Sequence, residues 1–301
     1  MKAVVLPEYG EASRLELRDI AEPTPGPNEI KVRVAAASLN PIDWKLRGGA
    51  YKAYSKLELP AVLGRDVSGE VVAVGPGVTS PRVGARVVGL VNRGYAEYVV
   101  APLDAWAEVP AGLDLVDAAA LPLVLLTGAQ LAEQATDVRA GQTVLVTGAT
   151  GGVGRAAVFA AKKRGAIVYA GVRGIHEVAA AKLGVHAVVA IDDDREIDKL
   201  PMLDALADTV GGPTTQKLLA KLKPGARIGS VLGEPAGAKE RGFDVHAFGV
   251  KPDAKRLGEL VADVAVGELV IPISKRFPLA EAAQAHALAE KGGVGKVLLV
   301  V

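Results

Sequence analysis

The stretch Thr143-Val-Leu-Val-Thr147, followed by Gly148-Ala-Thr-Gly-Gly-Val-Gly154, decides the fold of this chain. A short apolar run rich in β-branched residues leads into a glycine-dense turn, and an alanine-rich amphipathic segment then continues to about Arg164. Strand, glycine turn and helix are the parts of a βα unit that binds a pyrophosphate. The spacing is G-x-x-G-x-x-G rather than the plain G-x-G-x-x-G, so the turn alone also fits other α/β proteins.

Each residue of the glycine turn has an expected role. Gly148 lets the chain turn sharply out of the strand, and Gly154 lets the helix pack closely on that strand. Gly151 and Gly152 let backbone N–H groups approach phosphate oxygens. Val153, at which the expected helix begins, belongs to the same cofactor site.

A second strand, expected over residues 167–172, arrives where a ribose-reading residue should lie. An NAD-preferring unit usually has Asp or Glu at the end of this strand, to bond the ribose hydroxyls. Here no carboxylate appears until Glu177, and Arg173 stands just past the strand. Because a guanidinium grips a 2′-phosphate bidentately, the sequence favours NADPH over NADH. The alternative is that Arg173 is a solvated loop cation.

Composition limits the class of protein. The 301 residues are 50% hydrophobic, which is enough for a large core and suggests two domains. A net charge of +1 gives no support to nucleic-acid or anionic-membrane binding. The absence of cysteine excludes disulfides and thiolate metal sites. With no signal peptide and no apolar run long enough to span a bilayer, the sequence predicts a soluble, cytoplasmic protein.

The rhythm of the chain changes near residue 123. Residues 1–120 contain short strands with glycine breaks, which is typical of a compact β-barrel-like domain. Helices and strands alternate beyond that point, which favours a doubly wound parallel sheet. The expected strands cover 143–147, 167–172, 187–191, 203–209, 227–232 and 243–248. The apolar tail, 296–301, is expected to rejoin the N-terminal domain as a strand.

Four motifs, taken together, resemble one family. They are Leu39-Asn-Pro-Ile-Asp-Trp-Lys-Leu-Arg-Gly48, Leu63-Gly-Arg-Asp-Val-Ser-Gly-Glu-Val71, the glycine turn and Gly295-Lys-Val-Leu-Leu299. The chain resembles the zinc-independent quinone oxidoreductases of the medium-chain dehydrogenase/reductase superfamily. This resemblance implies an α/β fold in which both chain ends, 1–122 and 267–301, form a GroES-like β-barrel domain. A Rossmann domain with a doubly wound parallel sheet, 123–266, is inserted between them.

The chain departs from the zinc-bearing branch of that superfamily at its metal positions. Asn40 stands where that branch has a zinc-binding cysteine, and Gly64-Arg-Asp66 replaces its Gly-His-Glu. The histidines, at positions 176, 186, 246 and 286, are scattered, so we expect no metal site. Without a Lewis acid, hydride transfer favours acceptors that delocalise negative charge themselves, such as quinones and enones.

The resemblance also implies catalytic residues, and each has a simpler alternative. Asn40 and Asp43 should lie near the nicotinamide, with Tyr51 as a phenolic donor to the developing oxyanion. Alternatively, Asn40 only shapes a turn, Asp43 only caps a short helix beginning at Trp44, and Tyr51 is an ordinary, partly buried aromatic residue. We expect Asp66 to be structural, pairing with Arg65 or with a backbone donor.

The resemblance extends the cofactor site beyond the glycine turn. It adds Thr127, Leu232 and Gly233, and it places the Lys296 ammonium at a phosphate or ribose of the cofactor. The sequence thus predicts an NADPH-dependent reductase of quinones or related α,β-unsaturated carbonyls. Alternatives are an enoyl or alkenal reductase with little quinone activity, and a nicotinamide-binding sensor or RNA-associated protein. The alternating strand 243–248 fits a sheet edge, which predicts a homodimer.

Overall fold

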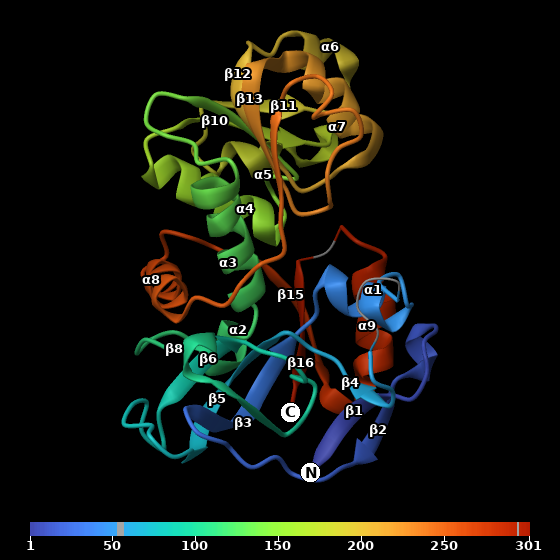
Figure 1. Ribbon diagram of the computed structural model, residues 1–301, viewed down its shortest axis with the longest axis vertical. Coiled ribbons are helices and arrows are strands. Elements are labelled where there is room, and N and C mark those ends of the chain that lie inside the picture. The colour runs from blue at the N-terminus through green and yellow to red at the C-terminus, as the bar shows by residue number, and fades with distance from the viewer. Residues whose placement is uncertain (53–56, 294) are drawn as a thin grey trace. The chain divides into compact units, whose positions relative to one another are not determined.

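The computed structural model describes residues 1–52, 57–293 and 295–301 (Figure 1). These residues form two compact units. Unit 1 comprises Met1–Leu123 together with Pro252–Val301, and unit 2 comprises Val124–Lys251. Among the described residues, no helix is both long enough and apolar enough to cross a membrane.

Unit 2 is built on a parallel six-stranded sheet in the order β11-β10-β9-β12-β13-β14. The predicted strands are confirmed; the largest shift is at β13, which begins five residues earlier than expected because it also pairs with the start of β12. The order reverses between β9 and β12, and in open α/β sheets ligands bind at the carboxyl ends of the strands at such a point. The strands are β9 (Thr143–Thr147), β10 (Ile167–Val172), β11 (Ala187–Ala190), β12 (Leu203–Asp208), β13 (Leu222–Ser230) and β14 (Asp244–Ala247).

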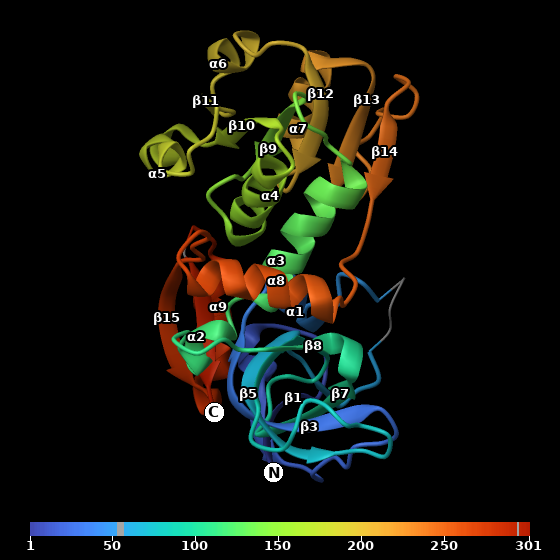
Figure 2. The same cartoon turned by 90° about the vertical axis from the view of Figure 1, so that its left-hand side faces the viewer.

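Helices cover the sheet of unit 2 (Figure 2). α4 (Gly152–Lys163) follows β9, and its small residues let it approach α3 (Pro122–Gln130) closely, because a Cβ on Gly128 would lie 2.5 Å from that of Ala156. α3 continues as a π-helical turn, η3 (Leu131–Ala135). The remaining helical segments are η4 (Gly174–His176), α5 (Glu177–Ala181), α6 (Asp194–Asp198), α7 (Gly212–Leu218) and η5 (Leu219–Lys221).

Unit 1 joins the two ends of the chain. In its described residues a seven-stranded sheet runs β15-β16-β3-β5-β6-β8, with β7 also paired to β3, and a smaller sheet runs β2-β1-β4. β16 (Lys296–Val300) lies antiparallel to β3 (Glu29–Ser38), so the C-terminal tail rejoins the N-terminal domain as predicted. The other strands are β1 (Lys2–Leu6), β2 (Glu16–Asp19), β4 (Ala61–Val62), β5 (Asp66–Val74), β6 (Arg86–Leu90), β7 (Tyr98–Pro102), β8 (Trp106–Glu108) and β15 (Ile273–Pro278).

The helices of unit 1 include one that the sequence assigned to the other domain. α8 (Ala254–Ala265) buries Leu257, Leu260 and Val261 and contacts β8, so it groups with unit 1, although the expected Rossmann domain ran to residue 266. An amphipathic helix groups with the unit that covers its apolar face. The other helical segments are η1 (Ala12–Arg14), α1 (Pro41–Arg47), η2 (Leu103–Ala105), α2 (Leu115–Ala118), η6 (Leu279–Glu281) and α9 (Ala282–Glu290).

Candidate functional site

The glycine turn has the backbone that its sequence predicts. Gly148 has a φ of +62°, and a Cβ there would lie 2.5 Å from Thr209 Oγ1. A Cβ on Gly154 would collide with the carbonyl oxygen of Gly148, so α4 can approach the end of β9 only because residue 154 is glycine. The turn therefore places the N-terminus of α4 at the carboxyl end of the sheet.

The free backbone donors lie one step further along than expected. Gly151 donates its N–H to Gly148 O at 2.9 Å, so this group is already satisfied within the turn. The first bond of α4 runs from Arg155 N to Gly151 O at 2.8 Å. Within the described residues, the N–H groups of 152, 153 and 154 have no backbone acceptor. These three donors, at the positive end of a twelve-residue helix, are suited to an anion.

A buried carboxylate fixes the loop beside the glycine turn. Asp208 Oδ1, at the end of β12, accepts hydrogen bonds from Thr147 Oγ1 and Thr215 Oγ1, both at 2.9 Å. It also accepts from the backbone N–H groups of Val210 and Gly211. One oxygen thus holds together the ends of β9 and β12 and the start of α7. The sequence analysis did not identify Asp208; its signal is a carboxylate at a strand end followed by two glycines within four residues.

Arg173 is exposed directly after β10, as predicted, and one of its Nη atoms lies 3.2 Å from His176 Nε2. A carboxylate nevertheless lies nearby, because Asp192 Oδ1 accepts the N–H of Gly174 at 2.9 Å. Asp192 follows β11, and the parallel pairing of β11 with β10 brings the segments after both strands to the same edge of the sheet. A 2′-phosphate at Arg173 could therefore also contact His176, but the negative charge of Asp192 would repel it.

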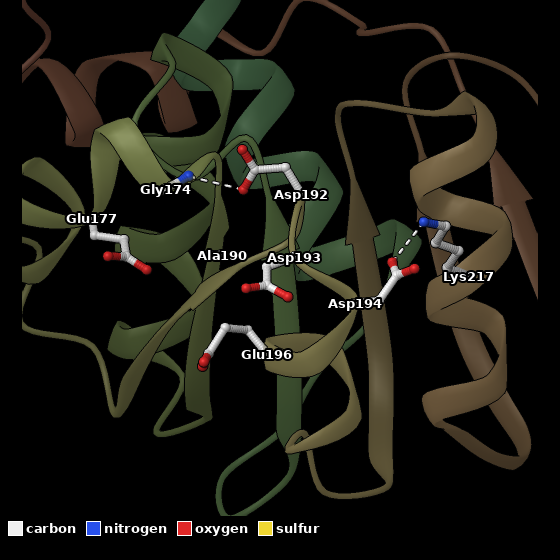
Figure 3. Close-up of a pocket in the computed structure, with 8 residues that line it drawn as sticks. All are labelled: Gly174, Glu177, Ala190, Asp192, Asp193, Asp194, Glu196 and Lys217. Atoms are coloured by element: carbon white, nitrogen blue, oxygen red, sulfur yellow. Dashed lines mark hydrogen bonds and ion pairs between the residues drawn. The ribbon is translucent and has the colours of Figure 1, made fainter.

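A cavity of about 680 Å³ lies at this edge of the sheet and is strongly acidic (Figure 3). Its lining is Gly174, Glu177, Ala190, Asp192, Asp193, Asp194, Glu196 and Lys217. The lining holds five carboxylates and one ammonium, that of Lys217, which is paired with Asp194 at 2.6 Å. No residue of the glycine turn lines this cavity, and its charge makes it unsuited to a pyrophosphate.

Three further predicted cofactor residues belong to unit 2. Thr127, in α3, is 6% exposed, and its hydroxyl oxygen has no hydrogen-bond partner among the described residues. Leu232 lies just past β13 and is 45% exposed, which is unusual for leucine next to a buried sheet. Gly233 has a φ of +98° and open space where a Cβ would point. An unsatisfied buried hydroxyl and an exposed apolar side chain are both features that a ligand can cover.

Unit 1 contains a buried polar network centred on Asp66. Its Oδ2 accepts from Ser38 Oγ at 2.7 Å and Asn40 Nδ2 at 2.8 Å, and lies 3.3 Å from Lys296 Nζ. Its Oδ1 accepts the N–H of Leu123 at 2.7 Å. Asp66 is fully buried, so these donors are what makes its charge tolerable. Of the two partners expected for Asp66, the backbone donor is present as the N–H of Leu123, whereas Arg65 bonds to Val91 O instead.

Asn40 and Lys296 are committed to this network. The Lys296 ammonium donates to Asn40 Oδ1 at 2.7 Å and to Leu39 O at 3.0 Å, and the side chain is 8% exposed. The ammonium was expected at a phosphate or ribose of the cofactor; in the structure it is instead the internal counter-charge of Asp66. Asn40 is 1% exposed, and its amide serves the same network rather than standing free for a substrate carbonyl.

Asp43 caps α1 from its third helical position, in a capping box with the N-cap Asn40, rather than from the position before a helix that begins at Trp44. Its Oδ2 accepts the N–H of Asn40 at 2.8 Å and the hydroxyl of Tyr95 at 2.9 Å. α1 accordingly begins at Pro41 rather than at Trp44. Burial raises the pKa of Asp43 to about 7. Asp43 is fully buried and its two hydrogen bonds are made within the protein, so its catalytic role stays a prediction.

The polar network continues from Tyr95 to the surface of unit 1. The Tyr95 ring packs edge-on against His286 with centroids 5.7 Å apart. His286 Nδ1 lies 3.1 Å from a guanidinium nitrogen of Arg47, which pairs with Glu290 at 2.8 Å. Burial lowers the pKa of His286 to about 3 and raises that of Tyr95 well above its usual range. No pattern in the sequence distinguishes Tyr95 from an ordinary core residue.

Tyr51 is the one predicted catalytic side chain outside this network. It is half-buried in the turn after α1. No hydrogen bond to its hydroxyl is seen in the part of the chain that the structure describes. Its proposed donor role therefore stays a prediction.

The residues at the positions of the zinc-bearing branch do not fit zinc. Arg65 donates its Nε to Val91 O, and a guanidinium cannot ligate a metal. The Lys296 ammonium already lies between Asn40 and Asp66, where a second cation would be repelled. Elsewhere in the described residues, no group of three or more His, Cys, Asp or Glu side chains is arranged to hold a metal ion.

The chain is similar to known proteins along its whole length. Residues 26–111 match the family described as alcohol dehydrogenase GroES-like domain, and residues 183–299 match the one described as zinc-binding dehydrogenase. Quinone oxidoreductases of Sus scrofa and Pseudomonas aeruginosa are 30% and 32% identical, covering 100% and 99% of this chain and 98% and 99% of theirs.

Solved structures give the same picture. The quinone oxidoreductase from Coxiella burnetii superposes with a TM-score of 0.90 at 33% identity, covering 100% of this chain and 99% of that one. An NAD-dependent alcohol dehydrogenase gives 0.89 at 32% identity over the full length of both chains. The Escherichia coli quinone oxidoreductase complexed with NADPH gives 0.87 at 25% identity, again over both full lengths.

Proposed function

This chain belongs to the quinone oxidoreductase family of the medium-chain dehydrogenase/reductase superfamily, and on that premise we propose that it transfers hydride from NADPH to a quinone or a related α,β-unsaturated carbonyl. The observation that carries the proposal is the turn after β9, which leaves three backbone donors of α4 free at the switch point of the parallel sheet. A nicotinamide cofactor would supply the hydride.

The residues of unit 2 are suited to hold such a cofactor. The N–H groups of 152–154 would bind the pyrophosphate, since they lie at the positive end of α4. Thr127 offers a hydroxyl with no partner in the described residues, and Leu232 offers an exposed apolar contact for the nicotinamide ring. Gly233 is open on its Cβ side, so a ring could approach the backbone there.

Arg173 supports NADPH as the preferred cofactor. Its guanidinium is exposed and has no carboxylate partner among the described residues, so a 2′-phosphate could pair with it and with His176. Asp192 opposes this preference from the adjacent strand end. We therefore expect NADPH to bind more tightly than NADH by a modest factor, with NADH also used.

The side chains favour acceptors that can delocalise the negative charge they gain when they accept hydride. Asn40, Asp43 and Lys296 are bonded to one another and buried, so none of them provides a free acid at the surface of unit 1. A quinone that accepts hydride becomes a hydroquinone anion stabilised by its ring, and an enone that accepts hydride at its β-carbon becomes an enolate. Water then supplies the proton.

The test is NADPH oxidation with benzoquinones, naphthoquinones, enones and alkenals, with NADH and a metal chelator as comparisons. The proposal expects turnover on quinones or enones that chelator does not change. Turnover confined to alkenals would replace the quinone assignment by an alkenal reductase. Tight NADPH binding without turnover on any acceptor would contradict the reductase assignment and favour a nicotinamide-binding sensor.

A further inference from the structure

The first turn of α4 carries an arginine that the mechanism has not used. In a helix the side chains tilt toward the N-terminus, so the side chain of Arg155 extends back over the glycine turn. The structure shows this directly, because Arg155 Nε donates to Thr150 O at 2.9 Å. That bond holds the guanidinium at the glycine turn, on the residue two positions before the first free N–H group, and no bond of its terminal nitrogens is seen among the described residues.

Nothing in the described part of the protein neutralises this guanidinium. Arg155 is half-buried, and no carboxylate pairs with it. Burial lowers the pKa of Arg155, and no carboxylate counteracts that effect. The other two half-buried arginines of unit 2, Arg164 and Arg227, both reach Asp137. Among the half-buried arginines of unit 2, Arg155 at the glycine turn is thus the one without a counter-charge in the described residues.

The position is also unfavourable in the helix itself. The first turn of α4 contains no acidic residue, and a cation there is repelled by the positive end of the helix dipole. An anion with several oxygens would remove both costs at once, since it could accept from the backbone donors and pair with the guanidinium. A diphosphate has the required charge and number of acceptors.

We propose that Arg155 binds the pyrophosphate of the cofactor from above the N-terminus of α4, as a cofactor-binding residue separate from the one that reads the 2′-phosphate. This inference rests on the proposed function of unit 2 as a nicotinamide-binding domain. It divides the recognition of the cofactor between two arginines. Arg155 serves the part that NADPH and NADH share, and Arg173 serves the part in which they differ.

The experiment measures dissociation constants by calorimetry for NADPH, NADH, ADP-ribose and adenosine 2′-phosphate. The variants are Arg155→Met, which keeps the aliphatic stem, and Arg155→Lys, which keeps the charge. Lys162→Met, an exposed cation near the other end of α4, is the matched control for loss of one positive charge. Thermal unfolding of each variant is measured in parallel.

We expect Arg155→Met to raise the dissociation constants of NADPH, NADH and ADP-ribose by the same factor, about tenfold. Adenosine 2′-phosphate should be unaffected, Arg155→Lys should recover part of the loss, and the difference should shrink at high ionic strength. Lys162→Met should bind all four ligands as the parent does.

Three results would overturn the assignment. Selective weakening of NADPH and adenosine 2′-phosphate would make Arg155 a reader of the 2′-phosphate. A lower melting temperature with unchanged affinities would show that Arg155 only stabilises the turn through its hydrogen bond to Thr150 O. Failure of the parent protein to bind NADPH, NADH or ADP-ribose would refute the proposed function itself, and the assignment of Arg155 with it.

Discussion

Asp43 and His286 should make opposite contributions to the pH dependence of the stability of unit 1. Burial raises the pKa of Asp43 from 3.8 to about 7 and lowers that of His286 from 6.5 to about 3. Between about pH 4 and pH 6.5, the folded protein therefore holds a proton on Asp43 and none on His286, whereas the unfolded chain holds one on His286 and none on Asp43. Both states bind one proton, so the two effects cancel in this window.

Replacing either residue should make the pH dependence that is due to the other measurable. A raised carboxyl pKa means that stability falls as pH rises from about 4 to about 7, by roughly 1.4 kcal/mol per unit and up to about 4 kcal/mol in total. A lowered histidine pKa means that stability is lost as pH falls from about 6.5 to about 3, by up to about 5 kcal/mol. The free energy of unfolding of Asp43→Asn, taken relative to the parent, should thus increase as pH rises from about 4 to about 7. That of His286→Asn, taken relative to the parent, should decrease as pH rises from about 3 to about 6.5.

The assay is urea unfolding followed by tryptophan fluorescence at a series of pH values. Both tryptophans, Trp44 and Trp106, belong to unit 1, so the signal reports the unit that contains the pair. Asn at 43 can still accept from Asn40 and Tyr95, and Asn at 286 can still accept from Arg47, so both variants are expected to fold. Differences between variant and parent that do not change with pH would refute the assigned protonation states.

Three further outcomes are expected. Lys296→Met should lower the free energy of unfolding of unit 1 by about 3–5 kcal/mol, because it leaves Asp66 without its counter-charge. The affinity of the folded protein for NADPH should stay the same. Normal stability with weakened NADPH binding would instead support the contact with a cofactor phosphate or ribose that the sequence predicts. Arg173→Ala should weaken the binding of NADPH by about 1.5 kcal/mol and leave the binding of NADH unchanged, whereas Asp192→Asn should increase the preference for NADPH. Both are measured by calorimetry. Equal effects on the two cofactors would show that neither residue reads the 2′-phosphate. Among the described residues, β14 pairs only with β13 and leaves an open edge. Light scattering at micromolar concentration should therefore give the mass of a homodimer, and a monomeric mass would reject that assembly.

The parts that the sequence predicted well are those where local pattern and tertiary structure agree. The run from Thr143 to Gly154 specifies strand, turn and helix through β-branching, glycine conformation and an amphipathic face, and all three form as expected. The tail 296–300 is apolar enough that only a buried strand position satisfies it.

The parts that the sequence did not predict depend on pairing between distant segments. Lys296 reads as a surface cation near the chain end, and only the register of β16 on β3 brings it to Asp66. Asp192 lies nineteen residues beyond Arg173 and reaches the same edge because two strands are parallel. Tyr95 bonds Asp43 across 52 positions, and no local pattern encodes that contact.

The most direct test of the central claim is a single turnover under anaerobic conditions. The protein is loaded with NADPH, either protiated or deuterated at C4 of the nicotinamide, and mixed with the best acceptor of the quinone and enone panel. The account predicts loss of one NADPH for each acceptor reduced, and slower loss when the transferred position carries deuterium. Bound NADPH that stays unoxidised with every acceptor would contradict the assignment of this chain as a hydride-transferring reductase.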